Sequence, residues 1–350
     1  MGKTRIIVEA TGGDSGYKEV ARGAELYLEE NHNVDLFLAA GKDKLKEDGY
    51  LTDSGELTDA AIPKGMDRDH IILTERTFYY PDKTSYKPSS IYRALNMHHS
   101  KEMDAVIAPG DTYSTVTYSS WRWKHEKIGE VRPAIAVDFS GNVLIDAGAN
   151  IECEPKNYQQ FAVMGSVISR YKLGIKDPLV GVVTNGTEFW KGNEAERRSL
   201  PLLEKLREKG YDITEGFFEP HILRDPERKG FRSGLVLVTN GLVGNAILKT
   251  AEMSFEVSGD LISQAYHEEP WWSRDLGALT FDRIRNKLRG KVDYSSFGVA
   301  PLYGYNNAEI LVGHGRSKAR AIARSVGRTL EHLTFHLNDR LREELERLKI

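Results

Sequence analysis

Residues 5–14 read RIIVEATGGD, and this stretch decides the fold class. Its first part, Arg5–Ala10, is a short β-branched run of the kind found in strands that are buried on both faces. Its last part is a loop of small residues with two adjacent glycines. A buried strand that leads straight into such a loop begins a βα unit, so the stretch predicts a mostly parallel sheet with crossover helices.

The same alternation of short apolar runs and longer amphipathic stretches continues along the chain. It predicts further strands at Asp35–Ala40, His70–Thr74, Asp104–Ala108, Ala134–Phe139, Val143–Asp146, Leu179–Thr184, Gly234–Thr239 and Glu309–Val312. Most of these runs are bounded by Gly, Asp or Asn, which are common turn residues. The sequence therefore predicts an α/β fold.

Helices are predicted between these strands. Pro155 and Gly174 bracket a helix over Tyr158–Leu173, and Asn193 caps a helix over Glu194–Lys209. The segment 317–350 is predicted to be one long helix, because apolar residues recur at steps of three and four. These residues are Ile322, Val326, Leu330, Leu333, Leu337, Leu341, Leu345 and Leu348. The stripe favours packing on the core, and a helix of this length can also reach a second subunit.

The stretch 41–66 is polar and strand-poor, which indicates a helix and loop insertion. Since no linker or internal repeat interrupts the chain, residues 1–350 are interpreted as a single catalytic α/β domain with two lobes.

Composition excludes several classes of function. The 350 residues are 40% hydrophobic and 28% charged, which suits a globular protein, and the net charge of −3 offers no basic excess for nucleic acid. We find no signal peptide and no bilayer-spanning run, so a cytoplasmic protein is expected. The single cysteine, Cys153, excludes an intrachain disulfide and a cysteine-based metal site. No metal and no cofactor is predicted.

Glycine-punctuated loops follow several of the predicted strands. They are Thr11–Asp14, Pro109–Thr112, Ala147–Asn150, Asn185–Asn193 and Asn240–Asn245. Glycine lets backbone N–H groups approach a ligand closely, and helices that begin beyond such loops favour anions. Ligands of open α/β sheets bind outside the carboxyl ends of the strands, so the loops predict a phosphate site. None matches the Walker A or GxGxxG pattern, so neither ATP nor NAD is expected.

Four side chains in or near these loops are candidates for chemistry. Lys191 lies in a Gly-rich turn before a helix and could bind phosphate; a solvated lysine is the alternative. Asn245 could donate to a thioester oxygen or phosphate, or cap a helix. His314 could be an acid–base group or phosphate donor, or bond a loop carbonyl. Cys153 has no neighbouring His in the sequence and is interpreted as a small buried hydrophobe.

Several segments, in this order, resemble the acyl-ACP:phosphate acyltransferases of bacterial phospholipid synthesis. They are EATGGD (9–14), DAGANIECEPKNYQQFAVMGSV (146–167), NGTEFWKGNE (185–194), NGLVGNAILKTAE (240–252), KVDYSSFGVAPLYG (291–304) and GHGRSKARAI (313–322). The resemblance covers nearly the whole chain. It implies a three-layer α/β/α sandwich, isocitrate/isopropylmalate dehydrogenase-like and shared with phosphotransacetylases. It also implies a homodimer with its site in a cleft near the interface.

The resemblance further implies that inorganic phosphate attacks the thioester of acyl–acyl carrier protein, giving acyl phosphate and free carrier. Phosphate is already an anion, so positioning and oxyanion stabilisation would carry catalysis. Lys191, with the amides of Gly12 and Gly13, would bind phosphate; Asn245 would steady the oxyanion. His314 and Arg316 would close the phosphate site. The other implied phosphate- or acyl-binding residues are Asp14, Asp111, Thr112, Gly148, Asn150, Thr187, Asn193, Asn240, Gly244 and Ser317.

Five positions depart from the family's pattern. Glu9 stands for Asp and Thr11 for Met; the loop PGDTYS has Asp111 for Asn and Tyr113 for Gly; and TNGL has Asn240 for Asp. If the last two loops face each other, an Asp111–Asn240 hydrogen bond would preserve one amide–carboxylate pair. The departures leave two alternatives open. One is a divergent paralogue that transfers a different acyl group, and the other is a non-catalytic scaffold that binds an acyl carrier.

Two further segments bear on partners. The helix after Asp111 reads TYSTVTYSSWRWKHEKIGE, which indicates either a wetter outer face or a changed acyl pocket or carrier surface. Segment 253–289 resembles the family's projecting helical hairpin, which implies peripheral contact with the inner face of a membrane or dimer packing. Its predicted amphipathic stripe is Leu276, Leu279, Ile284 and Leu288, and Trp271 and Trp272 lie near the tip. The acidic residues beside these tryptophans favour dimer packing.

Overall fold

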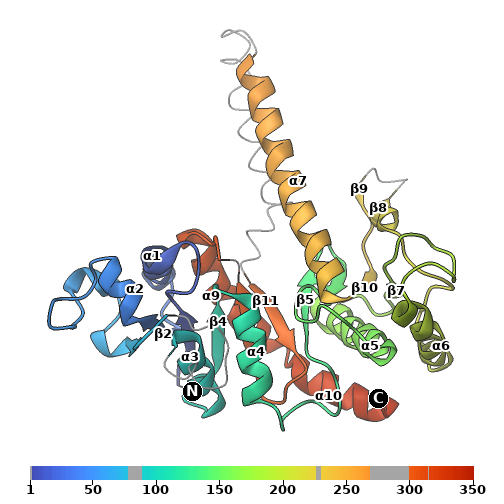
Figure 1. Ribbon diagram of the computed structural model, residues 1–350, viewed down its shortest axis with the longest axis horizontal. Coiled ribbons are helices and arrows are strands. Elements are labelled where there is room, and N and C mark those ends of the chain that lie inside the picture. The colour runs from blue at the N-terminus through green and yellow to red at the C-terminus, as the bar shows by residue number, and fades with distance from the viewer. Residues whose placement is uncertain (1, 78–88, 226–229, 269–298, 314) are drawn as a thin grey trace.

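A ten-stranded mixed sheet forms the middle layer of the protein (Figure 1). The computed structural model describes residues 2–77, 89–225, 230–268, 299–313 and 315–350. The strand order is β3-β2-β1-β4-β12-β11-β5-β6-β10-β7. The strands are β1 (Thr4–Glu9), β2 (Val34–Gly41), β3 (Ile71–Thr74), β4 (Ala105–Ala108), β5 (Ala134–Asp138), β6 (Val143–Ile145), β7 (Leu179–Val182), β10 (Leu235–Val238), β11 (Val299–Tyr303) and β12 (Ile310–Gly313). A separate two-stranded ribbon joins β8 (Arg224–Asp225) to β9 (Gly230–Phe231).

Helices cover both faces of the sheet. They are α1 (Gly16–Glu30), α2 (Lys42–Glu47), α3 (Ser90–His99), α4 (Thr112–Arg122), α5 (Pro155–Lys172), α6 (Glu194–Glu208), α7 (Gly241–Glu268), α9 (Ala319–Thr334) and α10 (Leu337–Leu348). Short 3₁₀ turns span Asp59–Ala61, Arg68–His70 and Pro220–Leu223. One face packs on α1, α9, α5, α6 and α10; the other packs on α3, α4 and the base of α7. The predicted three-layer α/β/α fold is confirmed.

All nine predicted strands are present, with ends that differ by one or two residues. The predicted helices at Tyr158–Leu173 and Glu194–Lys209 correspond to α5 and α6. The pattern reading missed β11, whose sequence VAPLY contains Pro301. Proline lacks the N–H that a central strand uses for its ladder, so strand patterns normally exclude it.

Strand β11 lies where the sheet changes from parallel to antiparallel pairing. Strands β3, β2, β1, β4 and β12 are parallel, but the β12–β11, β11–β5 and β5–β6 pairs are antiparallel. Strands β6, β10 and β7 are parallel to one another and therefore run opposite to β1, β4 and β12. The carboxyl ends of the two parallel groups consequently lie at opposite edges of the sheet.

The predicted single C-terminal helix is wrong, because the segment forms α9 and α10 with a break at Phe335 and His336. His336 adopts a left-handed conformation with φ of 47°. The apolar stripe also divides there. Leu330 and Leu333 pack with the α1 side of the core, whereas Leu337 and the later leucines pack with α5. Two packing partners in different directions need the bend, and neither glycine nor proline marks it in the sequence.

Helix α7 extends away from the body of the protein (Figure 1). The remainder of the predicted 253–289 hairpin, including Trp271, Trp272 and the Leu276–Leu288 stripe, lies outside the described residues. Among the described helices, none is long and apolar enough to cross a membrane. The insertion predicted at 41–66 contains α2 and a short 3₁₀ turn, with Leu51 and Leu57 paired in an isolated bridge.

Candidate active site

The first group of loops follows β1, β4 and β12 at one edge of the sheet. Ser15 N donates to Gly315 O at 3.1 Å, so the β1 and β12 loops are joined directly. A Cβ atom at Gly13 would lie 2.9 Å from Pro109 O and 3.0 Å from Gly315 O. Glycine at position 13 is therefore required for three loops to pack together. This group holds Gly12, Gly13, Asp14, Asp111, Thr112, Arg316 and Ser317 of the predicted site.

Glu9 accepts a hydrogen bond from the Gly12 amide, one of the two amides that the resemblance assigns to phosphate. Its carboxylate accepts hydrogen bonds from Thr11 N at 3.0 Å and from Gly12 N at 2.8 and 3.0 Å. The hydroxyls of Ser90, at 2.6 Å, and Thr11, at 3.2 Å, also donate to it. The Gly12 amide is therefore already hydrogen bonded to an internal carboxylate, and its role in phosphate binding stays a prediction.

Asp146 likewise accepts hydrogen bonds from loop amides in the second group of loops, which follows β6, β10 and β7. Its Oδ1 accepts from the amides of Ile135, Gly148 and Ala149 at 3.0, 3.2 and 3.0 Å. Its Oδ2 accepts from both Asn150 N and Asn150 Nδ2 at 2.7 Å. Asn150 Oδ1 in turn accepts from Arg132 Nε at 2.6 Å. The Gly148 amide and the Asn150 side chain thus make internal hydrogen bonds, and the ligand roles of Gly148 and Asn150 stay predictions.

Burial raises the pKa of both the Glu9 and the Asp146 carboxyl, and their hydrogen bonds to N–H and O–H donors oppose that shift. Both side chains are almost fully buried. Because the neighbours of Asp146 all donate, the ionised form fits its surroundings best. Each of the two strand-end carboxylates fixes the shape of the loop that follows it.

The second group of loops contains both principal catalytic candidates, Lys191 and Asn245. Gly241 N donates to Asn150 O at 2.6 Å, and a Cβ atom at Gly244 would lie only 1.9 Å from Asp146 O. The first turn of α7 therefore packs directly on the β6 loop, and it carries Asn245 with an exposed side chain. The β7 loop carries Lys191, whose stem lies beside Gly186. Gly148, Asn150, Thr187, Asn193, Asn240 and Gly244 belong to the same group, whereas His314 lies outside the described residues.

Three of the predicted ligand residues cap helices. Asp111 accepts from Ser114 N at 2.7 Å, Asn193 from Glu196 N at 2.9 Å, and Asn240 from Val243 N at 2.9 Å. Asp and Asn are both favoured N-caps, which accounts for the exchange of one for the other at these positions. The suggested Asp111–Asn240 hydrogen bond is wrong, because the two residues lie in loop groups at opposite sheet edges.

The aromatic residues after Asp111 belong largely to the core. Trp123 is buried, with its ring centroid 5.0 Å from that of His99 and 6.2 Å from that of Tyr305. Trp121 packs against Tyr118, with centroids 5.7 Å apart. This segment therefore contributes packing between α3 and α4 rather than an aromatic surface patch.

Cys153 is not suited to be a nucleophile. Burial and the nearby Asp146 raise the pKa of its thiol to about 12, so the reactive thiolate is scarce at neutral pH. The interpretation of Cys153 as a small, partly buried hydrophobe agrees with its surroundings. Among the described residues, no cluster of His, Cys, Asp and Glu has the geometry of a metal site.

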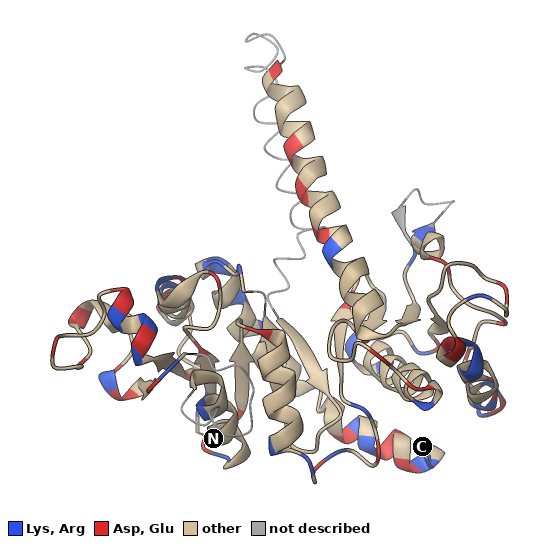
Figure 2. Ribbon diagram, in the orientation of Figure 1, with Lys and Arg blue, Asp and Glu red and all other residues tan. Residues whose placement is uncertain are grey.

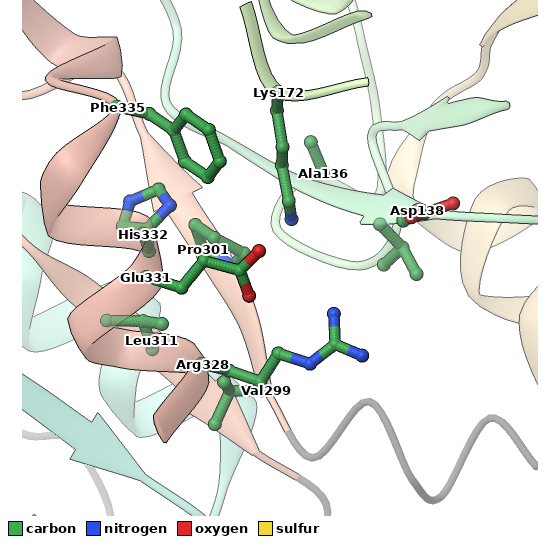
Figure 3. A pocket seen from close by; sticks show the side chains of 11 residues that line it. Ala136, Asp138, Lys172, Val299, Pro301, Leu311, Arg328, Glu331, His332 and Phe335 are labelled. Atoms are coloured by element: carbon green, nitrogen blue, oxygen red, sulfur yellow. The ribbon is translucent and has the colours of Figure 1, made fainter. Parts of the chain in front are cut away.

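Two hollows lie away from the second loop group. One, of about 530 Å³, lies between the β1 loop and α2 and includes Lys18 and Lys44, which the sequence reading did not single out. The other lies between α5 and α9, and Figure 3 shows Lys172, Glu331 and Arg328 pointing into it. Burial lowers the pKa of Lys172. Neither hollow contains Lys191 or Asn245.

Comparison with known proteins identifies the family. A family model described as "Fatty acid synthesis protein" matches residues 4–338. Proteins named phosphate acyltransferase from Aliarcobacter butzleri and Nitratiruptor sp. are 29% and 28% identical, and the matches cover 97% and 98% of both chains. A phosphotransacetylase from Streptococcus pyogenes has a similar fold, with a TM-score of 0.54 at 13% identity and coverage of 94% of each chain. The chain therefore belongs to the fatty acid synthesis protein family.

Proposed function

We propose that this protein is a phosphate acyltransferase that uses the thioester of an acyl carrier protein as its acyl donor. A phosphate oxygen attacks the thioester carbonyl carbon, so a C–O bond forms as the C–S bond breaks. The products are acyl phosphate and the carrier thiol, which takes up a proton. The family and the names of its relatives support phosphate acyl transfer, and the arrangement around Lys191 supports the finer statement.

The observation that carries the proposal is that the second loop group presents both polar and apolar side chains at its surface. Lys191 supplies a cation and Asn245 an amide donor at the same sheet edge. Large apolar side chains are exposed in the same three loops, namely Ile151, Phe189, Trp190 and Leu242. The rings of Phe189 and Trp190 stack edge to face with centroids 4.8 Å apart. A surface that is both cationic and apolar suits phosphate beside an acyl chain.

In this mechanism Lys191 holds phosphate and offsets its charge as it approaches the thioester. The Asn245 side-chain amide donates to the carbonyl oxygen as that oxygen becomes negative. Because the raised pKa of the Cys153 thiol disfavours its thiolate, Cys153 is not the acyl acceptor, and direct attack by phosphate is the proposed route.

The direct test is incubation of the protein with phosphate and a panel of acyl-ACP and acyl-CoA thioesters, with free thiol and acyl phosphate both measured. We expect the two products in equal amounts and a preference for the carrier-protein donor. Turnover of acyl-CoA alone would reject the carrier as donor. Tight carrier binding without any turnover would instead favour the scaffold alternative.

The exposed side of α7 supports a homodimer as the working form. Met253, Val257 and Leu261 are exposed and recur every four residues, so they form one stripe. Charged residues of α7 are mostly acidic, as Figure 2 shows, which disfavours contact with an anionic membrane. A second copy is therefore the proposed partner of this stripe.

Val257→Lys with Leu261→Lys is expected to convert a dimer into a monomer, because two lysines would be buried without partners. Light scattering of the intact protein measures the mass, and Ser258→Lys on the same helix is the matched control. A double variant that stays dimeric would remove α7 from the interface. Sedimentation of the wild-type chain with anionic vesicles would then assign the stripe to a membrane.

A further inference from the structure

We propose that the hollow between α5 and α9 binds a protonated oxyanion, hydrogen phosphate, at a site separate from the Lys191 loop. This inference goes beyond the proposed function and does not depend on it. Polar side chains enter the hollow from both helices, Lys172 from the last turn of α5 and Arg328 and His332 from the second half of α9 (Figure 3). Residues of β5, β11 and β12 form the rest of its wall.

His332 supplies the observation that points to a ligand. Its side chain is almost fully buried, and its Nε2 atom lies 3.0 Å from Oε2 of Glu309. Since an ionised carboxylate only accepts, the proton of the neutral ring lies on Nε2, and Nδ1 keeps a lone pair. That Nδ1 atom is buried and has no hydrogen-bond partner among the described residues. A buried acceptor needs a donor, and a ligand in the hollow that His332 lines can provide one.

Lys172 supplies a positive charge without a partner. Its ammonium group makes no hydrogen bond and no ion pair with a described residue, although Asp138 and Glu331 line the same hollow. Burial lowers the pKa of Lys172, and the positive charge of Arg328 lowers it further. A partly buried cation that lacks a paired anion is costly, so the arrangement favours an anionic ligand.

Hydrogen phosphate meets both requirements. Its O–H group can donate to Nδ1 of His332, and its unprotonated oxygens can accept from Lys172. Sulfate has the same shape but no proton, so its oxygens would face the lone pair of Nδ1. The carboxylates of Asp138 and Glu331 strengthen this discrimination, because they accept a proton and repel a fully ionised oxyanion. The lining residues therefore favour phosphate over sulfate.

The size of the hollow restricts the ligand further. Its volume of about 30 Å³ has room for about two or three water-sized groups. A free phosphate ion suits this space, whereas an ester substituent or an acyl chain does not. Apolar walls, including Val299, Leu311 and Phe335, keep the local dielectric constant low and strengthen the contacts to the ion.

Calorimetric titration of the Lys191→Ala protein with inorganic phosphate tests the site without a contribution from Lys191. We expect saturable binding of phosphate and a higher midpoint of thermal unfolding, with no response to sulfate or glycerol 3-phosphate. Adding Lys172→Met should weaken phosphate binding at least about 10-fold, because a charge-assisted hydrogen bond is lost. Lys176→Met is the matched control, since Lys176 is an exposed lysine just beyond α5, and it should leave binding unchanged.

A second pair of variants keeps the test decisive if Lys172→Met does not fold. Arg328→Met should also weaken phosphate binding, whereas Arg324→Met, one turn earlier on α9 and exposed, should not. The proposal is overturned if Lys191→Ala binds no phosphate, if sulfate or glycerol 3-phosphate binds as tightly, or if the Lys172 and Arg328 variants bind normally. Because binding is measured without turnover, an inactive wild-type protein would count against the proposed function alone.

Discussion

Lys191→Ala is expected to lower kcat/KM for phosphate by about 100- to 1000-fold while leaving the free energy of unfolding almost unchanged. Lys191 is a cation of the β7 loop, which follows the strand next to the one that leads to Asn245, and its stem lies over Gly186. The side chain is partly exposed, so truncation leaves no cavity in the core. Loss of a charge that meets the phosphate should therefore appear in catalysis rather than in stability.

Initial rates at varied phosphate measure this effect, and urea denaturation measures stability. Lys205→Ala is the matched control, since Lys205 is an exposed lysine farther along α6. Lys191→Arg should recover part of the activity, because it keeps the charge but changes the geometry of its donors. A Lys191→Ala enzyme with wild-type kcat/KM at low phosphate would exclude Lys191 from the phosphate site.

The strands were predictable because each is a short apolar run closed by turn residues, as in Arg5–Ala10. The direction of strands β6, β10 and β7 relative to β1, β4 and β12 was not predictable. It depends on antiparallel pairing of β11, which contains Pro301 and whose partner β5 is remote from it in sequence. Local patterns report which segments form strands, but not which way a distant strand enters the sheet. The sequence therefore suggested one loop edge where the fold has two.

For a related reason, some of the predicted site residues make hydrogen bonds within the protein while others lie at its surface. Residue type indicates what Asn150, Asn193 and Asn240 can donate or accept, but their partners are set by the tertiary structure. Asn150 and the capping asparagines bond within the protein, and the Gly12 amide bonds Glu9. Lys191, Thr187, Asn193 and Asn245 reach the surface of the second loop group.

Asp146→Ala is expected to destabilise the protein by about 4 kcal/mol or more. The substitution would leave the N–H groups of Ile135, Gly148, Ala149 and Asn150 without their acceptor. Each buried unsatisfied donor costs about 1–3 kcal/mol, and water can reach only some of them in a site that is fully buried. Since a typical domain is stable by only about 5–15 kcal/mol, this single change approaches the whole margin.

The midpoint of urea unfolding measures the effect, with the exposed Asp177→Ala as matched control. Asp146→Asn discriminates between loss of acceptor and loss of shape. It preserves volume but turns an NH₂ group toward N–H donors, so it should still cost about 2 kcal/mol or more. Equal stability of Asp146→Asn and wild type would mean that shape alone matters, and that the carboxylate does not organise the loop. Because the start of α7, which carries Asn245, packs against this loop, even a folded Asp146→Asn protein should lose activity as well as stability.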